Sequence, residues 1–301
     1  MQKPRVAFIG LGVMGFPMAG HLVSRGGLPV TVFNRTRERA VAWLEKFADE
    51  SNQAAIADSP AHAAEGADIV FACVGDDPDL RAITIGPEGA FATLRKGAVF
   101  VDHTTASANI ARELSHIATS RGFSFLDAPV SGGQSGAENG ALTVMVGGEA
   151  EAFEAARPVI AHFAKAITHM GDSGSGQLTK MVNQICIAGL LEGLAEGLNL
   201  AERVGLDPEK VLAVISKGAA QSWQMENRGH TMVAGKFDFG FAVDWMRKDL
   251  RICLEEAVRA GADLPATRLI AGFYDELSRN GSGRWDTSSL IQRLRELREH
   301  E

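Results

Sequence analysis

Short apolar runs alternate with segments of helical periodicity over the first 170 positions. The apolar runs predict strands at Arg5–Ile9, Val30–Asn34, Ile69–Val74, Val99–Asp102, Ser124–Asp127 and Leu142–Gly147. The periodic segments predict helices at Phe16–Ser24, Arg37–Phe47, Ser59–Glu65, Ser107–Arg121 and Glu149–His162. Strands that alternate with helices in this way indicate βαβ units and a mostly parallel, doubly wound sheet with helices on both faces.

The pattern changes after Gly176, where we expect helices and no strand. Leu178–Val204 is apolar on nearly every side, which predicts one long buried helix of roughly 40 Å. Gly205 is placed to end it in a left-handed cap, and Asp207-Pro208 is a typical start for the next helix. Further helices are predicted at Val211–Ser216, Val243–Ala260, Pro265–Arg279 and Ser289–His300.

These patterns together predict an α/β protein with two domains. Residues 1–172 would form an N-terminal Rossmann-type doubly wound sheet, and residues 173–301 a C-terminal all-α domain that begins with the long connecting helix. A length of 301 residues is sufficient for two hydrophobic cores.

The composition narrows the possible partners. A net charge of −7 argues against a nucleic-acid surface, which needs clustered Lys and Arg. We expect Cys73, Cys186 and Cys253 to be buried reduced thiols, and no Cys/His spacing indicates a metal site. The first strand begins too early for a signal peptide, and no apolar run reaches transmembrane length. We therefore expect a cytoplasmic protein that does not bind membranes.

The most informative motif is the G-x-G-x-x-G sequence Gly10-Leu11-Gly12-Val13-Met14-Gly15, between a predicted strand and a predicted helix. Gly10 permits the turn out of the strand, Gly12 lets a pyrophosphate approach the backbone, and Gly15 allows close helix–strand packing. The helix N-terminus adds free N–H groups for the phosphates. The alternative is an ordinary glycine-rich turn, but the strand–turn–helix context favours a dinucleotide site.

The end of the second predicted strand indicates which dinucleotide binds. An Asp or Glu there would select NAD by binding the ribose 2′-hydroxyl. This chain has Asn34-Arg35-Thr36 instead. Arg35 can pair with a 2′-phosphate and Thr36 can donate to it, so NADP is favoured and NAD remains possible. The alternative is that Arg35 is only a solvated turn residue.

Two further segments are candidates for substrate chemistry. Ser131, Gly132 and Gly133 follow a predicted strand and can present successive N–H groups to a carboxylate, although an ordinary glycine loop would have the same sequence. Lys180 follows the glycine-rich loop Gly171–Gly176 and shares a helix face with Asn183 and Gln184. Burial near a helix N-terminus would favour its neutral amine, which can exchange a proton with an alcohol oxygen. The alternative is a solvated lysine.

With these motifs the chain resembles the β-hydroxyacid dehydrogenase family nearly end to end. The family includes 3-hydroxyisobutyrate dehydrogenase, tartronate semialdehyde reductase and glyoxylate/succinic semialdehyde reductase. Four motifs carry the resemblance: G-L-G-x-M-G at Gly10–Gly15, D-A-P-V-S-G-G at Asp127–Gly133, G-x-x-G-x-G-x-x-x-K at Gly171–Lys180, and K-D-L at Lys248–Leu250. The sequence departs from many members in having Gln184, rather than Asn, four residues after Lys180.

The resemblance implies a role for each matching position. Lys180 would be the catalytic proton donor and acceptor. Ser131, Gly132, Gly133 and Asn183 would bind and orient the substrate. Val74 would line the cofactor path, and Thr105 would touch the nicotinamide side. Lys248 would approach the nicotinamide from the helical domain. Members are commonly homodimers or homotetramers that associate through their helical domains.

The resemblance thus implies hydride transfer between NADP(H) and a small 3-hydroxy acid or semialdehyde that carries a carboxylate. Gln184 favours, weakly, a semialdehyde substrate like that of tartronate semialdehyde reductase. Two alternatives remain: an imine reductase-like enzyme, although that group usually lacks the lysine, and a non-catalytic nucleotide-binding sensor that has kept the fold.

Overall fold

A computed structural model describes residues 3–48 and 53–296 in two compact units, Met1–Lys180 and Met181–Glu301. The strands of the first unit are β1 Val6–Ile9, β2 Val30–Phe33, β3 Ala55–Ile56, β4 Ile69–Ala72, β5 Val99–Asp102, β6 Ser124–Asp127, β7 Val130–Ser131, β8 Leu142–Gly147 and β9 Ala164–Gly171. Its helices are α1 Gly15–Ser24, α2 Arg37–Phe47, α3 Pro60–Ala64, α4 Asp77–Ile85, α5 Ala108–Arg121, α6 Gly133–Glu138 and α7 Ala150–Ile160.

The strands form one sheet in the order β3-β2-β1-β4-β5-β6-β8-β7, with β9 paired to β8. The first six strands in this order, from β3 through β2, β1, β4 and β5 to β6, are parallel to one another. Strand β8 runs antiparallel to β6 and β7. The order 3-2-1-4-5-6 of the first six strands is that of the Rossmann fold. The predicted doubly wound sheet is therefore confirmed.

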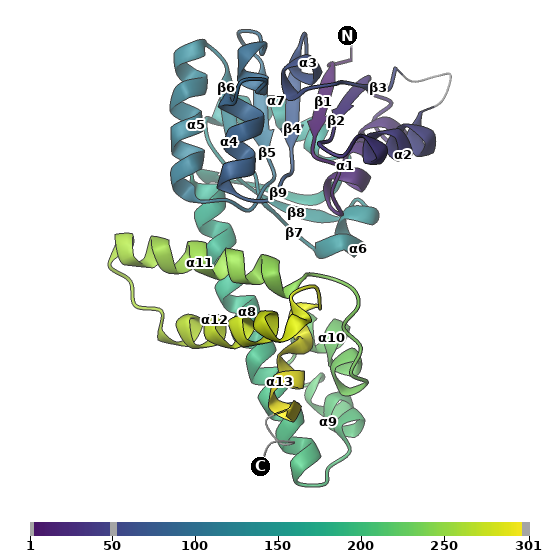
Figure 1. Ribbon diagram of the computed structural model, residues 1–301, viewed down its shortest axis with the longest axis vertical. Coiled ribbons are helices and arrows are strands. Elements are labelled where there is room, and N and C mark those ends of the chain that lie inside the picture. The colour runs from purple at the N-terminus through teal and green to yellow at the C-terminus, as the bar shows by residue number, and fades with distance from the viewer. Residues whose placement is uncertain (1–2, 49–52, 297–301) are drawn as a thin grey trace. The chain divides into compact units, whose positions relative to one another are not determined.

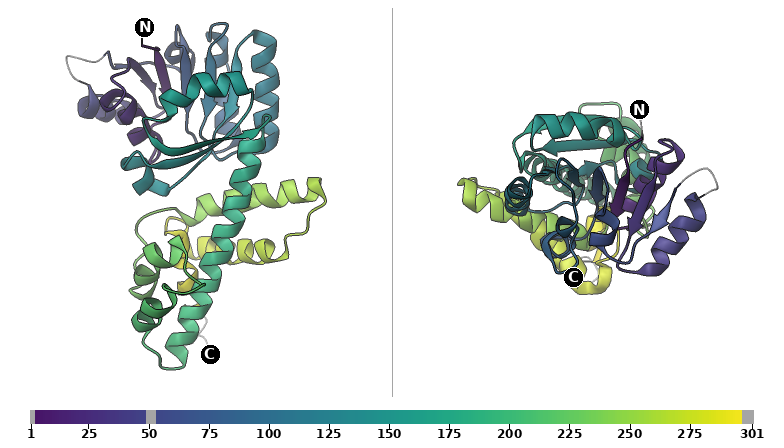
Figure 2. Two further views of the ribbon diagram at one scale, coloured as in Figure 1. Left: turned by 180° about the vertical axis from the view of Figure 1, so that it is seen from behind. Right: turned by 90° about the horizontal axis from the view of Figure 1, so that it is seen from above.

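Both faces of the sheet are covered, as Figure 1 shows. One core joins the sheet to α1, α2 and α7 through residues such as Met18, Trp43 and Phe153. The other joins the opposite face to α3, α4 and α5 through Leu80 and Leu114. Seen from behind, α7 crosses the sheet (Figure 2). Because β1 and β4 are buried on both faces, they read as unbroken apolar runs.

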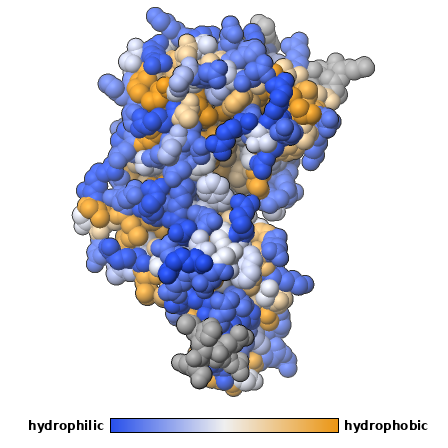
Figure 3. Space-filling model, viewed as in Figure 1, coloured by the Kyte–Doolittle hydropathy of each residue, from blue (hydrophilic) through white to orange (hydrophobic). Residues whose placement is uncertain are grey.

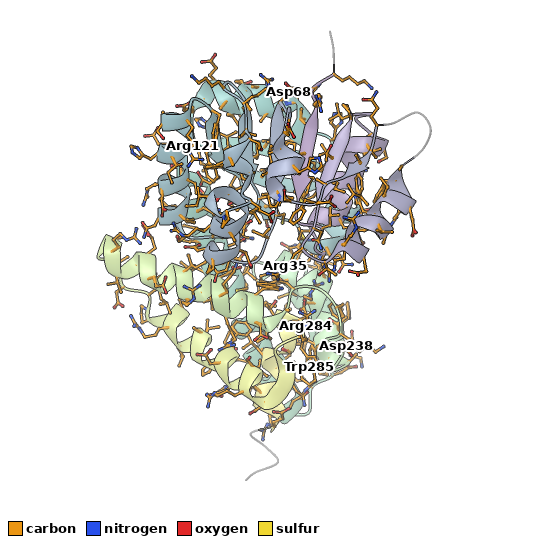
Figure 4. The ribbon with its side chains drawn as sticks, turned by 45° about the horizontal axis from the view of Figure 1, so that its top comes forward. Arg35, Asp68, Arg121, Asp238, Arg284 and Trp285 are labelled. Carbon is orange, nitrogen blue, oxygen red and sulfur yellow. The ribbon has the colours of Figure 1, made fainter. Side chains whose placement is uncertain are left out.

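The carboxyl ends of the parallel strands define the edge where ligands bind in such sheets. Arg35 follows β2 at this edge, whereas Asp68 precedes β4 at the opposite end (Figure 4). Asn34 and Val74, predicted as the last residues of their strands, lie just beyond the ends of β2 and β4 at the same edge.

Helix α8, Ser175–Arg203, begins in the first unit and continues into the second. The second unit adds α9 Pro208–Ile215, α10 Trp223–Val233, α11 Val243–Ala260, α12 Pro265–Leu277 and α13 Leu290–Glu296. Between Ser175 and Glu296 the structure has no strand, only an isolated bridge from Ala242 to Asp286. The predicted helical domain is thus confirmed, and the last four residues of the predicted Ser289–His300 helix lie outside the described residues.

The prediction that the long helix is buried on all sides is wrong. Leu191, Leu194 and Leu198 enter the core of the helical unit, but the opposite face is exposed. On that face the side chains of Val182, Leu190 and Leu200 are 62%, 46% and 62% exposed. Cys186 is exposed there too and Cys73 is half-buried, so the expectation of a buried thiol holds for Cys253 alone.

The sequence reading also missed several short elements. Strands β3 and β7 have two residues each, and β9 alternates exposed and half-buried positions, so their apolar signals are weak. Helices α4, α6 and α10 were not predicted either.

Figure 3 shows a mainly hydrophilic surface on the helical unit, with an apolar patch where α11 meets α12. No helix in the described part of the chain has the length and apolar character of a membrane span.

Candidate active site

The glycine turn after β1 has the shape that a dinucleotide requires. Gly10 has a φ of 95°, and a Cβ there would lie 2.3 Å from the carbonyl oxygen of Cys73. A Cβ on Gly15 would lie 2.0 Å from the carbonyl oxygen of Gly10, so neither position admits a side chain. A Cβ on Gly12 would meet nothing within 4 Å, which leaves the backbone open to a ligand. The turn therefore fits a pyrophosphate at the start of α1.

Asn34 connects the end of β2 to this turn. Its Oδ1 accepts a hydrogen bond of 2.8 Å from the N–H of Leu11, and its Nδ2 donates to the carbonyl oxygen of Thr36. The side chain of Arg35 is 89% exposed, and its Nη1 lies 3.3 Å from Oδ1 of Asp79 on α4. Arg35 is therefore accessible at the carboxyl edge, and a phosphate would compete with one exposed carboxylate for it.

A buried glutamine joins two of the predicted cofactor loops to the start of α8. The Nε2 of Gln177 donates to the carbonyl oxygen of Thr104 (2.7 Å), and its Oε1 accepts from the N–H of Ala106 (3.1 Å). These two backbone groups flank Thr105. The hydroxyl of Thr104 also accepts from the N–H of Val74 (3.0 Å). One hydrogen-bonded network thus includes the N–H of Val74 and the backbone groups on both sides of Thr105.

Asp127, at the end of β6, holds the first turn of α8. Its two oxygens accept from the N–H of Gly174 (2.7 Å) and of Gln177 (2.9 Å). Burial raises the pKa of Asp127 to about 6, although these hydrogen bonds to the carboxylate oppose the rise. A Cβ on Gly176 would lie 2.4 Å from the carbonyl oxygen of Asp127. Glycine at 176 therefore permits a close approach of helix and strand.

Lys180 lies one turn after Gln177, and only 8% of its surface is exposed. Because its side chain is buried, Lys180 is not the solvated surface lysine of the alternative interpretation. Asn183 and Gln184 follow at i+3 and i+4 on α8. The network that orders Val74 and Thr105 thus also sets the turn of helix from which Lys180 projects.

A second chain of polar contacts runs through the helical unit. Asn183 Nδ2 donates to Gln184 Oε1 (2.8 Å), and Gln184 Nε2 donates to Asp249 Oδ2 (2.6 Å). The ammonium group of Lys248 lies 3.1 Å from Asp249 Oδ1 and 5.6 Å from the centre of the Trp245 ring. Gln184 therefore links α8 to the K-D-L motif on α11.

The Ser131–Gly133 segment forms a short strand that turns into α6. Ser131 pairs with Thr143 of β8, which fixes its register. Gly132 and Gly133 have φ values of 130° and 60°, which side chains disfavour, and a Cβ on Gly133 would meet no atom within 4 Å. The turn therefore depends on glycine at both positions and has open space beside Gly133, as a backbone site for an anion would need. The described residues contain no group of three or more His, Cys, Asp or Glu placed to hold a metal ion.

Comparison with known proteins identifies the family. Residues 5–171 match the profile of the NAD-binding domain of 6-phosphogluconate dehydrogenase. Residues 174–294 match that of the NAD-binding domain of NADP-dependent 3-hydroxyisobutyrate dehydrogenase. The chain belongs to the 3-hydroxyisobutyrate dehydrogenase-like family of β-hydroxyacid dehydrogenases. It is therefore an oxidoreductase of a family that binds NAD(P) and acts on small hydroxy acids, and the resemblance read from its motifs is confirmed.

Relatives match the chain along its whole length. An uncharacterized oxidoreductase of Shewanella frigidimarina is 56% identical over 98% of this chain and 99% of its own. The 2-hydroxy-3-oxopropionate reductase of Escherichia coli is 33% identical over 98% of this chain and 99% of its own. The structure of 3-hydroxyisobutyrate dehydrogenase from Mycobacterium tuberculosis with L-serine superimposes with a TM-score of 0.88 at 30% identity, covering 98% of this chain and 100% of the other.

Imine reductases share the architecture of this family. The enzyme from a Pseudomonas species has a TM-score of 0.62 at 20% identity, over 97% of this chain and all of its own. An identity this low shows a common fold and carries no conclusion about activity.

Sequence reasoning missed the residues that organise the site. Asp127 stood in a quoted motif without a role, and its signal was a carboxylate at the end of a buried strand. Gln177 had no signal, because both ends of its amide bind backbone atoms of a loop about 70 positions away. The sequence places Gln184 on the face of Lys180, but its contact with Asp249 depends on how α8 and α11 pack and has no sequence signal.

Proposed function

We propose that the protein transfers a hydride between NADP(H) and a small 3-hydroxy acid or semialdehyde that carries a carboxylate. 3-Hydroxyisobutyrate, tartronate semialdehyde and succinic semialdehyde represent the substrate class. One observation carries the proposal: Lys180 is buried one turn after Gln177, whose amide holds the backbone on both sides of Thr105. The names of the Escherichia coli and Mycobacterium tuberculosis relatives support this substrate class.

In the proposed mechanism Lys180 is the general acid and base. When bound, the nicotinamide supplies a hydride to the carbonyl carbon or accepts one from the carbinol carbon. Lys180 Nζ gives a proton to the carbonyl oxygen during reduction and takes it from the hydroxyl during oxidation. The N–H groups of Ser131, Gly132 and Gly133 bind the substrate carboxylate, and Asn183 orients it. A fixed arrangement of these groups provides much of the acceleration.

The proposal assigns the cofactor to the carboxyl edge of the sheet. The turn Gly10–Gly15, including Leu11, Val13 and Met14, would hold the pyrophosphate. Val74 would line the path of the cofactor, and Thr105 would touch the nicotinamide side. Arg35 and Thr36 would bind the 2′-phosphate beside Asn34, and Lys248 would serve the nicotinamide end. A cytoplasmic location stays a prediction.

Two other functions fit the fold and are outcomes of one experiment. The purified protein is mixed with NADPH or NADH and a panel of semialdehydes, the matching hydroxy acids with oxidised cofactor, and cyclic imines with reduced cofactor. We expect absorbance changes at 340 nm with semialdehydes and hydroxy acids. Turnover of imines alone would identify an imine reductase, and cofactor binding without turnover of any compound would indicate a nucleotide sensor.

Cofactor choice makes a separate prediction. Arg35→Ala should raise KM for NADPH about tenfold, because it removes a charge-assisted contact to the 2′-phosphate, and should leave KM for NADH unchanged. Arg37→Ala is the matched control, because Arg37 pairs with Asp58 at the surface nearby. An unchanged ratio of the two KM values in Arg35→Ala would show that Arg35 does not select the phosphate.

We infer further that the protein assembles as a homodimer or homotetramer through α8. Gly189, Gly193 and Gly197 are exposed at every fourth position, and a Cβ on any of them would meet no atom within 4 Å. They lie along the exposed apolar face that includes Leu190 and Leu200. Exposed apolar faces of this kind mark association sites, and the glycines allow a second backbone to come close.

Gly193→Leu tests this inference. In a monomer the leucine would point into solvent and raise the thermal midpoint, because glycine is a poor helix former by about 1 kcal/mol. In the proposed assembly it would obstruct the partner, so light scattering should show 32.0 kDa chains in place of multiples of that mass. Gly272→Leu on α12, whose Cβ also meets open space, should leave the mass unchanged. A wild-type protein of 32.0 kDa would refute the assembly.

A further inference from the structure

Two side chains near the end of α1 bind the carbonyl groups at the end of α6, more than 100 residues away. Nε2 of His21 lies 3.0 Å from the carbonyl oxygen of Ala137 and 3.1 Å from that of Glu138. Nη2 of Arg25 donates to the carbonyl oxygen of Asn139 at 2.9 Å. The final carbonyl groups of a helix have no hydrogen-bond donors within the helix. His21 and Arg25 supply such donors to the end of α6.

Arg25 makes two more contacts, and the fold leaves room for them. Its Nη1 donates to the carbonyl oxygens of Gly140 (3.4 Å) and His162 (3.3 Å). A Cβ on Gly140 would lie 2.1 Å from this nitrogen, and Gly140 has a φ of 60°. Both the close approach and the left-handed backbone therefore favour glycine at this position. A cation is also favourable at the negative end of a helix.

His21 acts in this contact as a neutral donor. Burial, and to a smaller degree the charge of Arg25, lowers the pKa of His21. The two carbonyl partners require the proton on Nε2, which assigns the tautomer. We name the contacts of His21 and Arg25 with residues 137–140 the α1–α6 clamp.

The clamp matters because of what lies at the other ends of the two helices. Helix α6 has six residues and begins at Gly133, directly after Ser131 and Gly132. Helix α1 begins at Gly15, which closes the dinucleotide turn. A helix of ten residues, about 15 Å long, thus connects the cofactor turn to the segment that presents the carboxylate-binding amides.

Helix α6 depends on contacts with other elements for its stability. Its sequence, Gly133-Gln-Ser-Gly-Ala-Glu138, contains two glycines, and six residues are too few for a stable isolated helix. Its own hydrogen bonds therefore do not fix the orientation of the loop before it. The buried Ala137 anchors α6 on the sheet, and the pairing of Ser131 to Thr143 fixes the strand before it. The contacts from His21 and Arg25 hold the far end of α6, and so contribute to the orientation of the loop.

We propose that His21 and Arg25 are positioning residues, which set the carboxylate-binding loop at the correct distance from the dinucleotide turn. They touch neither substrate nor cofactor. This inference rests on the proposed function, because it concerns the loop assigned to the substrate carboxylate. A purely structural role would change stability alone, whereas a positioning role changes the recognition of the carboxylate selectively.

The test compares two substrates that differ in one group. KM and kcat are measured with NADPH for a semialdehyde and for the aldehyde of equal length that lacks the carboxylate. Arg25→Ala should raise KM for the semialdehyde about tenfold and leave KM for the plain aldehyde within twofold, because a small displacement of the loop disrupts only carboxylate binding. Arg25→Lys keeps the cation and should restore part of the difference. Arg157→Ala, whose pair with Glu154 lies on α7, is the matched control.

Two readouts do not depend on turnover. Hydrogen exchange at residues 133–140 should accelerate in Arg25→Ala and in His21→Leu, and stay at the wild-type rate in Arg157→Ala. The Kd for a non-reactive short carboxylic acid, measured by calorimetry on the NADP complex, should rise about tenfold in Arg25→Ala, with the Kd for NADPH unchanged.

The outcomes separate the two proposals. A wild-type enzyme with equal KM for semialdehyde and aldehyde would overturn the proposed substrate class and the positioning role with it. A wild-type enzyme that prefers the carboxylate, together with an Arg25→Ala variant that keeps that preference, would overturn the positioning role alone. Equal losses for both substrates and for NADPH would also overturn it, because they would indicate a general distortion.

Discussion

Replacing Lys180 with methionine should lower kcat about 10³-fold and leave the Kd for NADPH unchanged. Proton transfer by a positioned side chain contributes about 10²- to 10⁴-fold to such reactions, and methionine fills the buried space without a proton to give. Gln177 and Asp127 hold the backbone around this position, so their hydrogen bonds should survive the change. The measurement is steady-state kinetics with saturating cofactor, together with cofactor fluorescence for binding.

A second variant separates loss of the amine from loss of the site. Lys180→Ala leaves space that a small primary amine can enter, so added ethylamine should restore part of the lost kcat. Lys210→Met, at an exposed lysine on α9, should behave like the wild type. A Lys180→Met enzyme with kcat within a few-fold of wild type would show that another group transfers the proton.

Between pH 6.5 and pH 4, the native state should lose about 3 kcal/mol of stability through His103 alone. Burial lowers the pKa of this histidine from its ordinary 6.5 to about 4. Its ring stacks on Phe71 at 5.6 Å and meets Phe163 edge-on, and its Nδ1 bonds the carbonyl oxygen of Ala128 at 2.6 Å. Its Nε2 has no hydrogen-bond partner among the described residues, so a proton there would be a buried, unsatisfied charge.

The sign of this effect follows from the depressed pKa. The neutral form is the one that the fold accepts, so the contribution is complete above the unfolded pKa and is lost as the pH falls towards the folded value. The pKa of Asp127 is raised by burial, to about 6, and burial raises that of Glu192 to about 7, so these groups act in the opposite direction. The net pH profile therefore mixes both contributions.

Comparison with a variant isolates the histidine. His103→Asn keeps a donor for Ala128 but cannot titrate. Its free energy of unfolding, measured with denaturant at several pH values, should therefore lack the decline of about 3 kcal/mol that we expect from His103. His116→Asn, at an exposed histidine on α5, should follow the wild type. Equal pH dependence in wild type and His103→Asn would show that the buried ring does not titrate in this range.

The sequence predicts the sheet well because burial leaves a direct mark on it. Strands such as β1 and β4 are buried on both faces, and Asp207-Pro208 begins α9 as expected, with Asp207 accepting from the N–H of Glu209. Helix α4 has a similar start signal in the sequence, since Asp76 caps it and Pro78 lies in its first turn, although its apolar periodicity alone does not predict it.

Other elements could not be predicted, because their stability comes from distant residues. Helix α6 is rich in glycine and is held by His21 and Arg25 from α1. The exposed face of α8 looked buried, since a run of apolar residues does not show which side has a partner within the same chain. The candidate site follows the same rule: motifs identify Lys180 and the glycines, while Gln177 becomes visible only through its backbone contacts.

Transfer of deuterium is the most direct test of the central claim, that this chain catalyses hydride exchange between NADPH and a carboxylate-bearing carbonyl compound. NADPH labelled with deuterium at the reactive nicotinamide carbon is mixed with the semialdehyde that the panel selects, and the product is examined by mass spectrometry. We expect one deuterium on the new carbinol carbon when the label has one configuration, and none when it has the other. A product without deuterium from either labelled cofactor would contradict the account.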